Sequence, residues 1–331
     1  MRAMLLEKPR VVEENPLRLV ELPLPEPAPG EIRVRVGVCG VCHTDLHMVE
    51  GDLTLPRLPV VPGHQIVGTV DALGEGANEF RLGDRVGVPW LYSTCGECAY
   101  CRKGLENLCE LARFTGFHVD GGYAEAMVVP AAFAYALPGT FSDLEAAPLL
   151  CAGIIGYRAL MLSNIQPGER LGIFGFGASG HIVIQIARYL HCEVCVFTRA
   201  ESHRQLARQL GAAWTGAAGE APPTPLDAAI IFAPAGKLVP EALRTLRRGG
   251  TLALAGITMS PLPEMEYRLL YQERILRSVA NSTRDDARSL LRLAAEIPLR
   301  TKVEPFQLPE ANHALQNLKG SKIHGASVLV I

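Results

Sequence analysis

The sequence has few of the features that mark a membrane protein or a nucleic-acid-binding protein. No apolar run among the 331 residues reaches the length of a membrane span. The formal net charge is −2, so no basic excess would attract nucleic acid or an anionic membrane. The N-terminus meets Glu7 and Lys8 after a very short apolar segment, and we therefore expect no secretory signal and a cytoplasmic location.

A disulfide scaffold is also disfavoured. Nine cysteines without a secretory signal fit metal or redox chemistry in a reducing compartment better than a set of disulfides. The length suits two domains, each with its own core. The one compositionally biased segment, AAGEAPPTP at 217–225, is expected to be a surface loop.

The first 150 residues or so have the pattern of a β-rich domain. In EIRVRVGVCG, Ile32 and Val34 alternate with Arg33 and Arg35, which is the period of a half-buried strand. HQIVGTVDAL and DRVGVPW are further short strands. Glycine and proline separate these segments, as in a small barrel or sandwich.

From about residue 165 the pattern changes to alternating strands and helices. The apolar run RLGIFGFG precedes the helix-like ASGHIVIQIARYL, and EVCVF, SHRQLARQL, DAAIIF, LVPEALRTL, GGTLALAG and RILRSVA follow. This alternation predicts a parallel, doubly wound sheet. The tail predicts a helix (DDARSLLRLAAE), a short strand, a helix near PEANHALQNL and a last strand, ASVLVI.

Four cysteines lie close together in CGECAYCRKGLENLC, with the spacing C-x2-C-x2-C-x7-C: Cys95, Cys98, Cys101 and Cys109. Four thiolates can close a tetrahedron around Zn²⁺ and leave no position for substrate, so we expect a structural zinc site. An iron–sulfur cluster is the alternative, because C-x2-C-x2-C also begins the bacterial ferredoxin motif. That motif continues with three residues and Cys-Pro, whereas here seven residues intervene and Glu follows.

A second set of metal-binding residue types is spread along the first domain. Cys42 lies in GVCHTDLH, His64 follows 22 residues later in VPGHQIVGTV, and Cys151 lies 87 residues further on in APLLCAG. These two thiolates and one imidazole would leave one position of a tetrahedral zinc ion open, as catalytic zinc requires. Spacing alone does not choose these three. The competing ligands are Cys39, His43 and His47.

Together these motifs resemble the zinc-dependent alcohol dehydrogenases of the medium-chain dehydrogenase/reductase superfamily. The resemblance runs over nearly the whole chain, through GVCHTDLH, PGHQIVGTV, GDRVGVPW, the four-cysteine segment, DGGYAEAM, APLLCAGI, GFGASG and SVANSTRDD. It implies an α/β protein with a GroES-like β-rich catalytic domain over residues 1–150, completed by 286–331, and a Rossmann cofactor domain over 151–285. It further implies a small-molecule substrate and a homodimer or homotetramer.

The resemblance also implies roles for individual residues. Asp45 matches the carboxylate behind the ligand histidine, although a turn or capping role is equally compatible with it. Trp90 matches the aromatic residue that narrows the substrate pocket. The other matches are Cys42, His64 and Cys151 for a catalytic zinc, Cys95, Cys98, Cys101 and Cys109 for a structural zinc, Thr44 and His47 for a proton relay, and His43 for the cofactor. The leftover cysteines are then ordinary small apolar residues: Cys39, Cys192 and Cys195.

A glycine-rich turn, GFGASG, predicts the cofactor site. It gives G-x-G-x-x-G at Gly175, Gly177 and Gly180, between an apolar strand and a helix. In this setting the turn, with Ala178 and Ser179, predicts a dinucleotide whose pyrophosphate lies at the helix N-terminus.

The end of the next strand bears on the choice of cofactor. NAD-specific folds place Asp or Glu there to hold the ribose 2′-hydroxyl. Here the position is Thr198, followed by Arg199, which can pair with a 2′-phosphate or be a solvated surface charge. His203 and Arg204 lie one helical turn further on and could assist. We therefore favour NADP(H) over NAD(H).

The chain departs from the family pattern in three places. The family often ends a late motif with Gly-Arg, whose Arg contacts the cofactor pyrophosphate, whereas here Ala326 follows Gly325 and Lys322 is the candidate to compensate. Where the family usually has Gly-His-Glu, this chain has Gly63, His64 and Gln65. Gln65 carries no charge and is a poor zinc ligand, so a zinc ion beside it should be a stronger Lewis acid. The segment between Gly211 and Asp227 is short, which predicts that a helix common in the cofactor domain is missing.

The leading functional hypothesis is a zinc-dependent oxidoreductase that interconverts a primary alcohol and an aldehyde. One alternative is a zinc-independent quinone or enoyl reductase of the same superfamily, and the intact set of three zinc ligands weighs against it. Another is a non-catalytic protein that binds zinc and a dinucleotide. The Thr44–His47 relay weighs against that, because binding alone needs no proton path.

Overall fold

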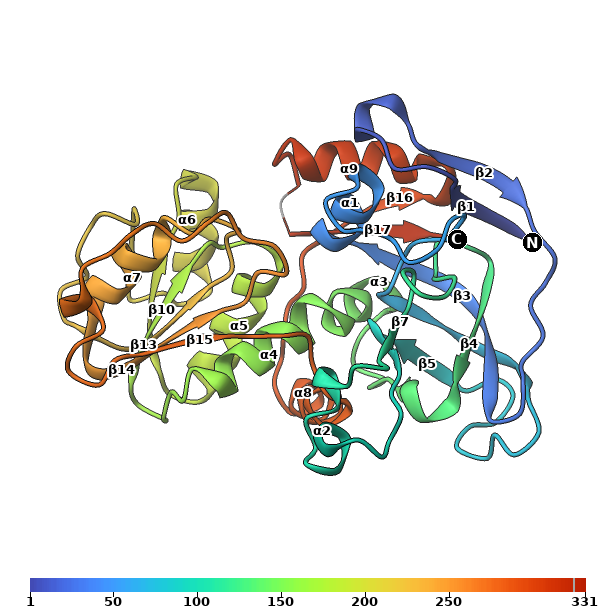
Figure 1. The fold of residues 1–331 in the computed structure, drawn as a ribbon, viewed down its shortest axis with the longest axis horizontal. Coiled ribbons are helices and arrows are strands. Elements are labelled where there is room, and N and C mark those ends of the chain that lie inside the picture. Colours follow the sequence, from blue (N-terminus) through green and yellow to red (C-terminus); the bar gives the residue numbers. More distant parts are fainter. Residues whose placement is uncertain (324) are drawn as a thin grey trace. The chain divides into compact units, whose positions relative to one another are not determined.

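The computed structural model describes residues 1–323 and 325–331. The chain separates into two compact units (Figure 1). The first comprises Met1–Cys151, Thr283–Ala295 and Thr301–Ile331, and the second comprises Ala152–Ser282 and Glu296–Arg300. The first unit is therefore built from both ends of the chain, and the second from its middle.

The first unit is organised around a sheet of seven strands. Six of them follow one another in the order β16 (Val303–Gln307), β17 (Ala326–Val330), β3 (Glu31–Val41), β4 (Ile66–Leu73), β5 (Arg85–Val88) and β9 (Tyr135–Ala136), and β8 (Ala126–Pro130) pairs with β3. Strands β16 and β17 are parallel, and the other neighbours are antiparallel. Along β3, Ile32 and Val34 are buried whereas Arg33 and Arg35 are more exposed, which confirms the predicted half-buried strand.

Shorter elements complete the first unit. Two small antiparallel pairs are β1 (Arg2–Leu6) with β2 (Leu17–Glu21), and β6 (Leu91–Ser93) with β7 (Arg113–Phe114). The helices are α1 (His43–Glu50), α2 (Ala99–Arg102), α3 (Asp143–Ala146), α8 (Arg284–Glu296) and α9 (Ala311–Lys319). Single 3-10 turns are η1 (Val12–Glu14), η2 (Glu106–Leu108), η3 (Ala131–Phe133), η4 (Ala147–Leu150) and η6 (Leu308–Glu310). The predicted order of the tail, helix, strand, helix and strand, is confirmed by α8, β16, α9 and β17.

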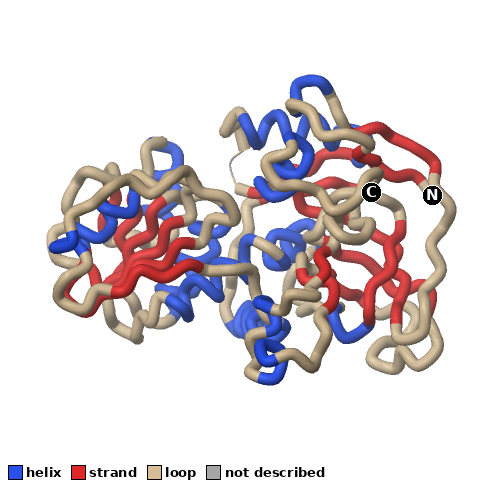
Figure 2. The backbone as a smooth tube through the Cα atoms, viewed as in Figure 1, coloured by secondary structure: helices blue, strands red, loops and turns tan. Residues whose placement is uncertain are grey.

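The second unit is a parallel sheet whose strands alternate with helices along the chain (Figure 2). The strand order is β12 (Trp214–Gly216), β11 (Glu193–Phe197), β10 (Arg170–Phe174), β13 (Leu226–Ile231), β14 (Leu246–Leu254) and β15 (Ile275–Ser278). Every neighbouring pair is parallel. Counted along the chain, this is the order 3-2-1-4-5-6 of the Rossmann fold, which confirms the predicted doubly wound sheet.

A helix or a 3-10 turn links consecutive strands, except between β12 and β13. The linking elements are α5 (Ala178–Tyr189), α6 (Glu201–Gln209), α7 (Leu238–Thr245) and η5 (Tyr267–Leu269), and α4 (Ala152–Leu162) precedes β10. Residues 217–225, all of them described, form no helix between β12 and β13, as the short segment predicted. The three-residue strand β12 was not predicted, and it makes this connection shorter still.

No single helix in the described part of the chain is long and apolar enough to cross a membrane. One bent pair, Asp143–Leu150 with Ala152–Leu162, meets the length and composition criteria only when its two helices are taken together.

Candidate active site

Three separate segments of the first unit bring two thiols and an imidazole together. Cys42 follows β3 and is the N-cap residue of α1, His64 precedes β4, and Cys151 follows η4. The ligand atoms of these residues all lie within 4.8 Å of one another, and Cys42 Sγ is 3.3 Å from His64 Nε2. Typical Zn–S and Zn–N bond lengths and a tetrahedral angle would place sulfur and nitrogen about 3.6 Å apart. The set of donors therefore fits a single zinc ion with one position left open.

Asp45 supports this set from behind. Its Oδ1 lies 3.1 Å from His64 Nδ1, and its Oδ2 accepts a hydrogen bond of 2.9 Å from the backbone N–H of Cys42. The Asp45 carboxylate thus contacts both the His64 ring and the N-cap residue of α1. This geometry is compatible with both roles considered for Asp45, as the carboxylate behind the ligand histidine and as a capping residue. Burial disfavours a charge on His64, but Asp45 and Cys42 raise the pKa of this histidine to about 10. A metal ion binding to Nε2 must therefore displace a proton.

Gln65 is buried beside His64 but is not a member of the metal-binding set. Its backbone carbonyl accepts from the N–H of Gly40 at 2.9 Å. A Cβ atom at Gly40 would lie 2.8 Å from Gln65 Cδ, so the space that Gln65 occupies depends on this glycine. The uncharged Gln65 side chain packs against Gly40, two residues before Cys42, at the position where the family usually has a carboxylate.

The residues predicted to move a proton lie on α1. Thr44 is half-buried, and His47 lies three residues further along, so the two share a helix face. His47 Nδ1 lies 2.8 Å from Oδ2 of Asp52, a partner that the sequence analysis missed. His43 is exposed, and its ring centroid lies 6.4 Å from that of His47. His43 and His47, which competed as metal ligands, are not part of the three-residue set.

An aromatic wall lies against the candidate metal ligands. The Trp90 ring meets the His64 ring edge to face, with centroids 4.7 Å apart and an interplanar angle of 72°. Phe114 stacks on Trp90 at 5.3 Å, and Phe117 lies 5.7 Å from it. Of these three rings only Trp90 could be predicted from the sequence, because Phe114 and Phe117 belong to a segment without a recognisable motif.

The four clustered cysteines form a second candidate metal site. Cys95 Sγ lies 3.8 Å from Cys101 Sγ and 3.6 Å from Cys109 Sγ, and all four sulfur atoms lie within 4.8 Å of one another. A disulfide would require about 2.05 Å. Thiolates around one tetrahedral zinc ion would be about 3.8 Å apart, whereas a cluster of several irons would hold them farther apart. Backbone N–H groups of Glu97 and Cys98 lower the pKa of the Cys95 thiol to about 7, which favours the thiolate.

This four-cysteine lobe is tied to the first turn of α8 by an ion pair. Glu106 accepts hydrogen bonds from the backbone N–H of Arg284 at 2.7 Å and from the Arg284 guanidinium at 2.7–3.1 Å. The guanidinium also lies 4.5 Å from the centre of the Phe133 ring. Sequence reasoning could not find this contact, because Glu106 and Arg284 are 178 residues apart.

In the second unit the glycine-rich turn follows β10. Gly175 has φ of +90°, and a Cβ there would lie 2.9 Å from the backbone nitrogen of Ala233, so the tight turn requires glycine. At Gly180 a Cβ would lie 3.0 Å from the carbonyl oxygen of Gly175, so this glycine permits α5 to pack closely on the turn. Apart from Gly177 itself and its two chain neighbours, no described atom lies within 4 Å of the Cβ position at Gly177. The first turn of α5, with Ala178 and Ser179, thus faces space that a ligand could fill.

The end of β11 carries the groups considered for cofactor selectivity. Arg199 is exposed and has no ion-pair partner among the described residues. Arg204 is engaged, because its Nε donates to the carbonyl oxygen of Thr198 at 3.0 Å. A nearby carboxylate that no sequence motif marks, Glu201, pairs with Arg208 at 3.0 Å. His203 is half-buried.

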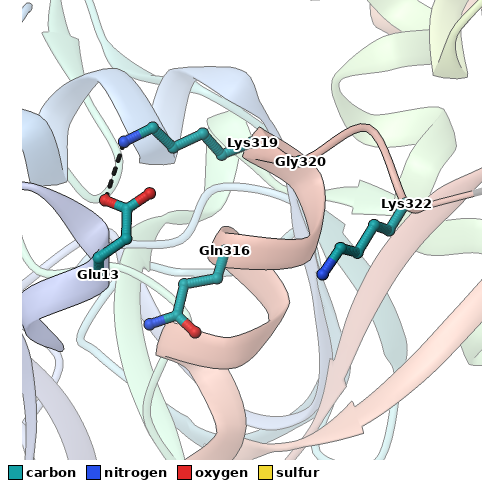
Figure 3. Close-up of a pocket in the computed structure, with 5 residues that line it drawn as sticks. All are labelled: Glu13, Gln316, Lys319, Gly320 and Lys322. Atoms are coloured by element: carbon teal, nitrogen blue, oxygen red, sulfur yellow. Dashed lines mark hydrogen bonds and ion pairs between the residues drawn. The ribbon is translucent and has the colours of Figure 1, made fainter.

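A surface pocket of about 370 Å³ lies apart from all these residues, at the end of α9 (Figure 3). It is lined by Glu13, Gln316, Lys319, Gly320 and Lys322. The Lys319 ammonium donates to Glu13 at 2.9 Å and to Glu50 at 2.7 Å, so its charge is already paired. Of the residues considered from the sequence, only Lys322, the candidate replacement for the family's late arginine, lines this pocket.

Comparisons with known proteins match this combination of a β-rich unit that holds two groups of candidate metal ligands and a Rossmann-fold unit. Residues 28–139 match the family model of the alcohol dehydrogenase GroES-like domain, and residues 178–296 match that of the zinc-binding dehydrogenases. A probable alcohol dehydrogenase, AdhA, from Mycobacterium tuberculosis is 50% identical over 100% of this chain and 97% of its own length. An alcohol dehydrogenase from Geobacillus stearothermophilus is 37% identical over 97% of this chain and 98% of its own.

Solved structures agree with these matches. A thermostable alcohol dehydrogenase from Pyrobaculum aerophilum, solved with cobalt and zinc bound, has a TM-score of 0.91 at 27% identity and covers 100% of this chain and 99% of its own. The fold and site thus define a dehydrogenase that combines a GroES-like domain with a Rossmann domain. The chain belongs to the zinc-dependent alcohol dehydrogenase family of the medium-chain dehydrogenase/reductase superfamily.

Proposed function

We propose that this protein is a zinc-dependent alcohol dehydrogenase that transfers hydride between a primary alcohol or its aldehyde and a nicotinamide cofactor, with NADP(H) favoured over NAD(H). The observation that carries the proposal is the donor set of Cys42, His64 and Cys151, whose ligand atoms converge within 4.8 Å. Three N and S donors with one open position are the arrangement of a catalytic zinc site. Alcohol dehydrogenases that match this chain over nearly its whole length support the same reaction class.

Two zinc ions per chain follow from the two groups of donors. Zinc held by Cys42, His64 and Cys151 would supply Lewis acidity to the oxygen of the alcohol or aldehyde and lower the pKa of the alcohol. Zinc held by the four cysteines has its shell filled by protein, so its role would be structural. Asp45 would hold the His64 ring in place and keep Nε2 available as a ligand.

The chain's own residues supply the path of the proton. We assign the Thr44 hydroxyl as the group that accepts the proton of the bound alcohol, and His47 as the group that carries it to solvent. Their shared face on α1 supports this order. In the reverse direction the same groups return a proton as an aldehyde is reduced.

The glycine-rich turn supports binding of the cofactor pyrophosphate. The space at Gly177 lies at the N-terminus of α5, where the first N–H groups have no partner within the helix and the helix dipole has its positive end. Arg199 supports a preference for the 2′-phosphate of NADP(H), because its charge has no partner among the described residues. The hydrogen bond from Arg204 Nε to the carbonyl oxygen of Thr198 supports a role for Arg204 in holding the end of β11 instead.

The wall formed by Trp90, Phe114 and Phe117 supports a narrow, apolar substrate pocket, which suits a primary alcohol, aliphatic or aromatic. The predicted homodimer or homotetramer and the predicted cytoplasmic location stay predictions. Light scattering of the purified protein would measure the first.

The test is alcohol-dependent reduction of NADP⁺ by protein with and without its zinc. We expect turnover in the zinc-loaded protein, loss on chelation and recovery when Zn²⁺ is restored. Turnover of a quinone or enoyl substrate that survives chelation would favour a zinc-independent reductase. Binding of cofactor and zinc without turnover of any alcohol or aldehyde in a broad panel would favour a non-catalytic protein.

A further inference from the structure

Three fully buried polar side chains lie together at the candidate zinc ligand His64. They are the ring of His64, the carboxylate of Asp45 and the hydroxyl-bearing ring of Tyr123. Neither the Tyr123 hydroxyl nor Asp45 Oδ1 makes a hydrogen bond of regular geometry within the described part of the chain, although Asp45 Oδ1 and His64 Nδ1 lie 3.1 Å apart. Buried polar groups in proteins are nearly always hydrogen-bonded, so the Tyr123 hydroxyl requires a partner.

The backbone around Tyr123 holds its ring beside His64. The N–H groups of Gly122 and Tyr123 donate to the carbonyl oxygens of Gly63 and Pro62, at 3.0 and 2.9 Å, so this segment pairs with the residues that lead into His64. Gly63 has φ of +99°, and a Cβ there would lie 2.4 Å from Tyr123 Cδ1. The Tyr123 ring thus fills the space that a side chain at Gly63 would take, and its position is fixed by packing.

The acceptor near the Tyr123 hydroxyl is the Asp45 carboxylate. Burial, and after it the charge of Asp45, raises the pKa of Tyr123 well above its usual range, so the hydroxyl keeps its proton and is a donor. An ionised carboxylate only accepts hydrogen bonds and has room for about four. Asp45 Oδ2 accepts from the backbone N–H of Cys42 at 2.9 Å, whereas Oδ1 faces His64 Nδ1 and has room for a second donor.

We propose that Tyr123 is a positioning residue of the zinc site, whose hydroxyl donates to Asp45 Oδ1 in the zinc-loaded protein and fixes the carboxylate that holds His64. This inference rests on the proposed function, because it requires zinc at the site of Cys42, His64 and Cys151. With the hydroxyl in place, the carboxylate is held from three directions. Without it, the carboxylate can rotate, and the His64 ring loses part of the support that keeps Nε2 turned toward the metal.

Tyr123→Phe tests the hydroxyl alone, because the ring and its packing against Gly63 are kept. Tyr92→Phe is the matched control. It removes another buried tyrosine hydroxyl from the same unit, one that donates to the Glu31 carboxylate at 2.8 Å. Asp45→Asn and the double variant of Asp45 and Tyr123 complete a double-mutant cycle, which shows whether the hydroxyl acts through the carboxylate.

The experiment measures the zinc affinity of both metal sites by competition with a chelator in these variants. We expect Tyr123→Phe to weaken the Cys42 site by about three- to tenfold, less than the 10–100-fold usual for a group that contacts the ligand histidine directly. The four-cysteine site should keep its affinity, and Tyr92→Phe should leave both sites unchanged. In the Asp45→Asn background, loss of the Tyr123 hydroxyl should cause no further decrease.

An unchanged or tighter Cys42 site in Tyr123→Phe would overturn the proposal and leave the proposed function intact. Additive losses in the double variant would also overturn it, because Tyr123 would then not act through Asp45. Equal weakening of both metal sites would do the same, since only a change in the whole unit affects both. A wild-type Cys42 site that binds no zinc would overturn the proposed function together with this proposal.

Discussion

Asp45 should control how tightly the site of Cys42, His64 and Cys151 binds zinc. The carboxylate is fully buried and meets two donors, His64 Nδ1 at 3.1 Å and the backbone N–H of Cys42 at 2.9 Å. In Asp45→Asn the amide oxygen can accept from one of these donors, and the amide nitrogen would face the other. One buried donor is then unpaired, which costs about 1–3 kcal/mol. The usual effect of losing a carboxylate behind a ligand histidine is a 10–100-fold weaker metal site, which corresponds to roughly 1.4–2.7 kcal/mol.

Competition with a chelator measures this effect, and the protein contains its own control. The four-cysteine site has no contact with Asp45 that would change, so its zinc affinity should stay the same while that of the Cys42 site falls. Zinc release should therefore occur in two separated steps in Asp45→Asn. The reasoning is refuted if the Cys42 site keeps its wild-type affinity, or if both sites weaken equally, since the second result would indicate general unfolding.

Three further predictions follow from other parts of the structure. Thr44→Ala should lower kcat by about 10²-fold without loss of zinc while Thr44→Ser keeps most of the activity, because only the hydroxyl is required; unchanged turnover of Thr44→Ala would remove Thr44 from the relay. Arg199→Ala should lower kcat/KM for NADP⁺ by about tenfold and leave that for NAD⁺ unchanged; a wild-type preference for NAD⁺ would contradict the assignment. Glu106→Gln should destabilise the first unit by about 2 kcal/mol in thermal or denaturant unfolding, because it removes the charge that pairs with Arg284; an unaltered midpoint would show that the pair contributes nothing.

Local patterns in the sequence predicted most of the fold. The alternation of Ile32 and Val34 with arginines specified β3, because a strand with one buried face must repeat every two residues. The strand, glycine turn and helix around Gly175 specified the start of the Rossmann unit. The short strand β12 escaped prediction, because three residues that include Trp214 carry no measurable period.

The candidate site also has one part that local sequence patterns predicted and another part that they could not predict. The four-cysteine lobe could be found from spacing alone, since one short loop holds all its members. The three-residue set could not, because its members come from three distant segments and only the fold, or a family resemblance, brings them together. Asp52 and Glu106 were missed for a related reason: a glycine turn brings the first to His47, and a separation of 178 residues hides the second from any local pattern.

The central claim is that zinc held by Cys42, His64 and Cys151 is required for turnover, and the most direct test is to remove that zinc alone. Metal analysis of the purified protein should find two zinc ions per chain, one for each group of donors. Cys42→Ala should retain only the zinc of the four cysteines, stay folded and lose alcohol-dependent reduction of both NADP⁺ and NAD⁺. Wild-type turnover by a Cys42→Ala protein that holds one zinc ion per chain would contradict the account.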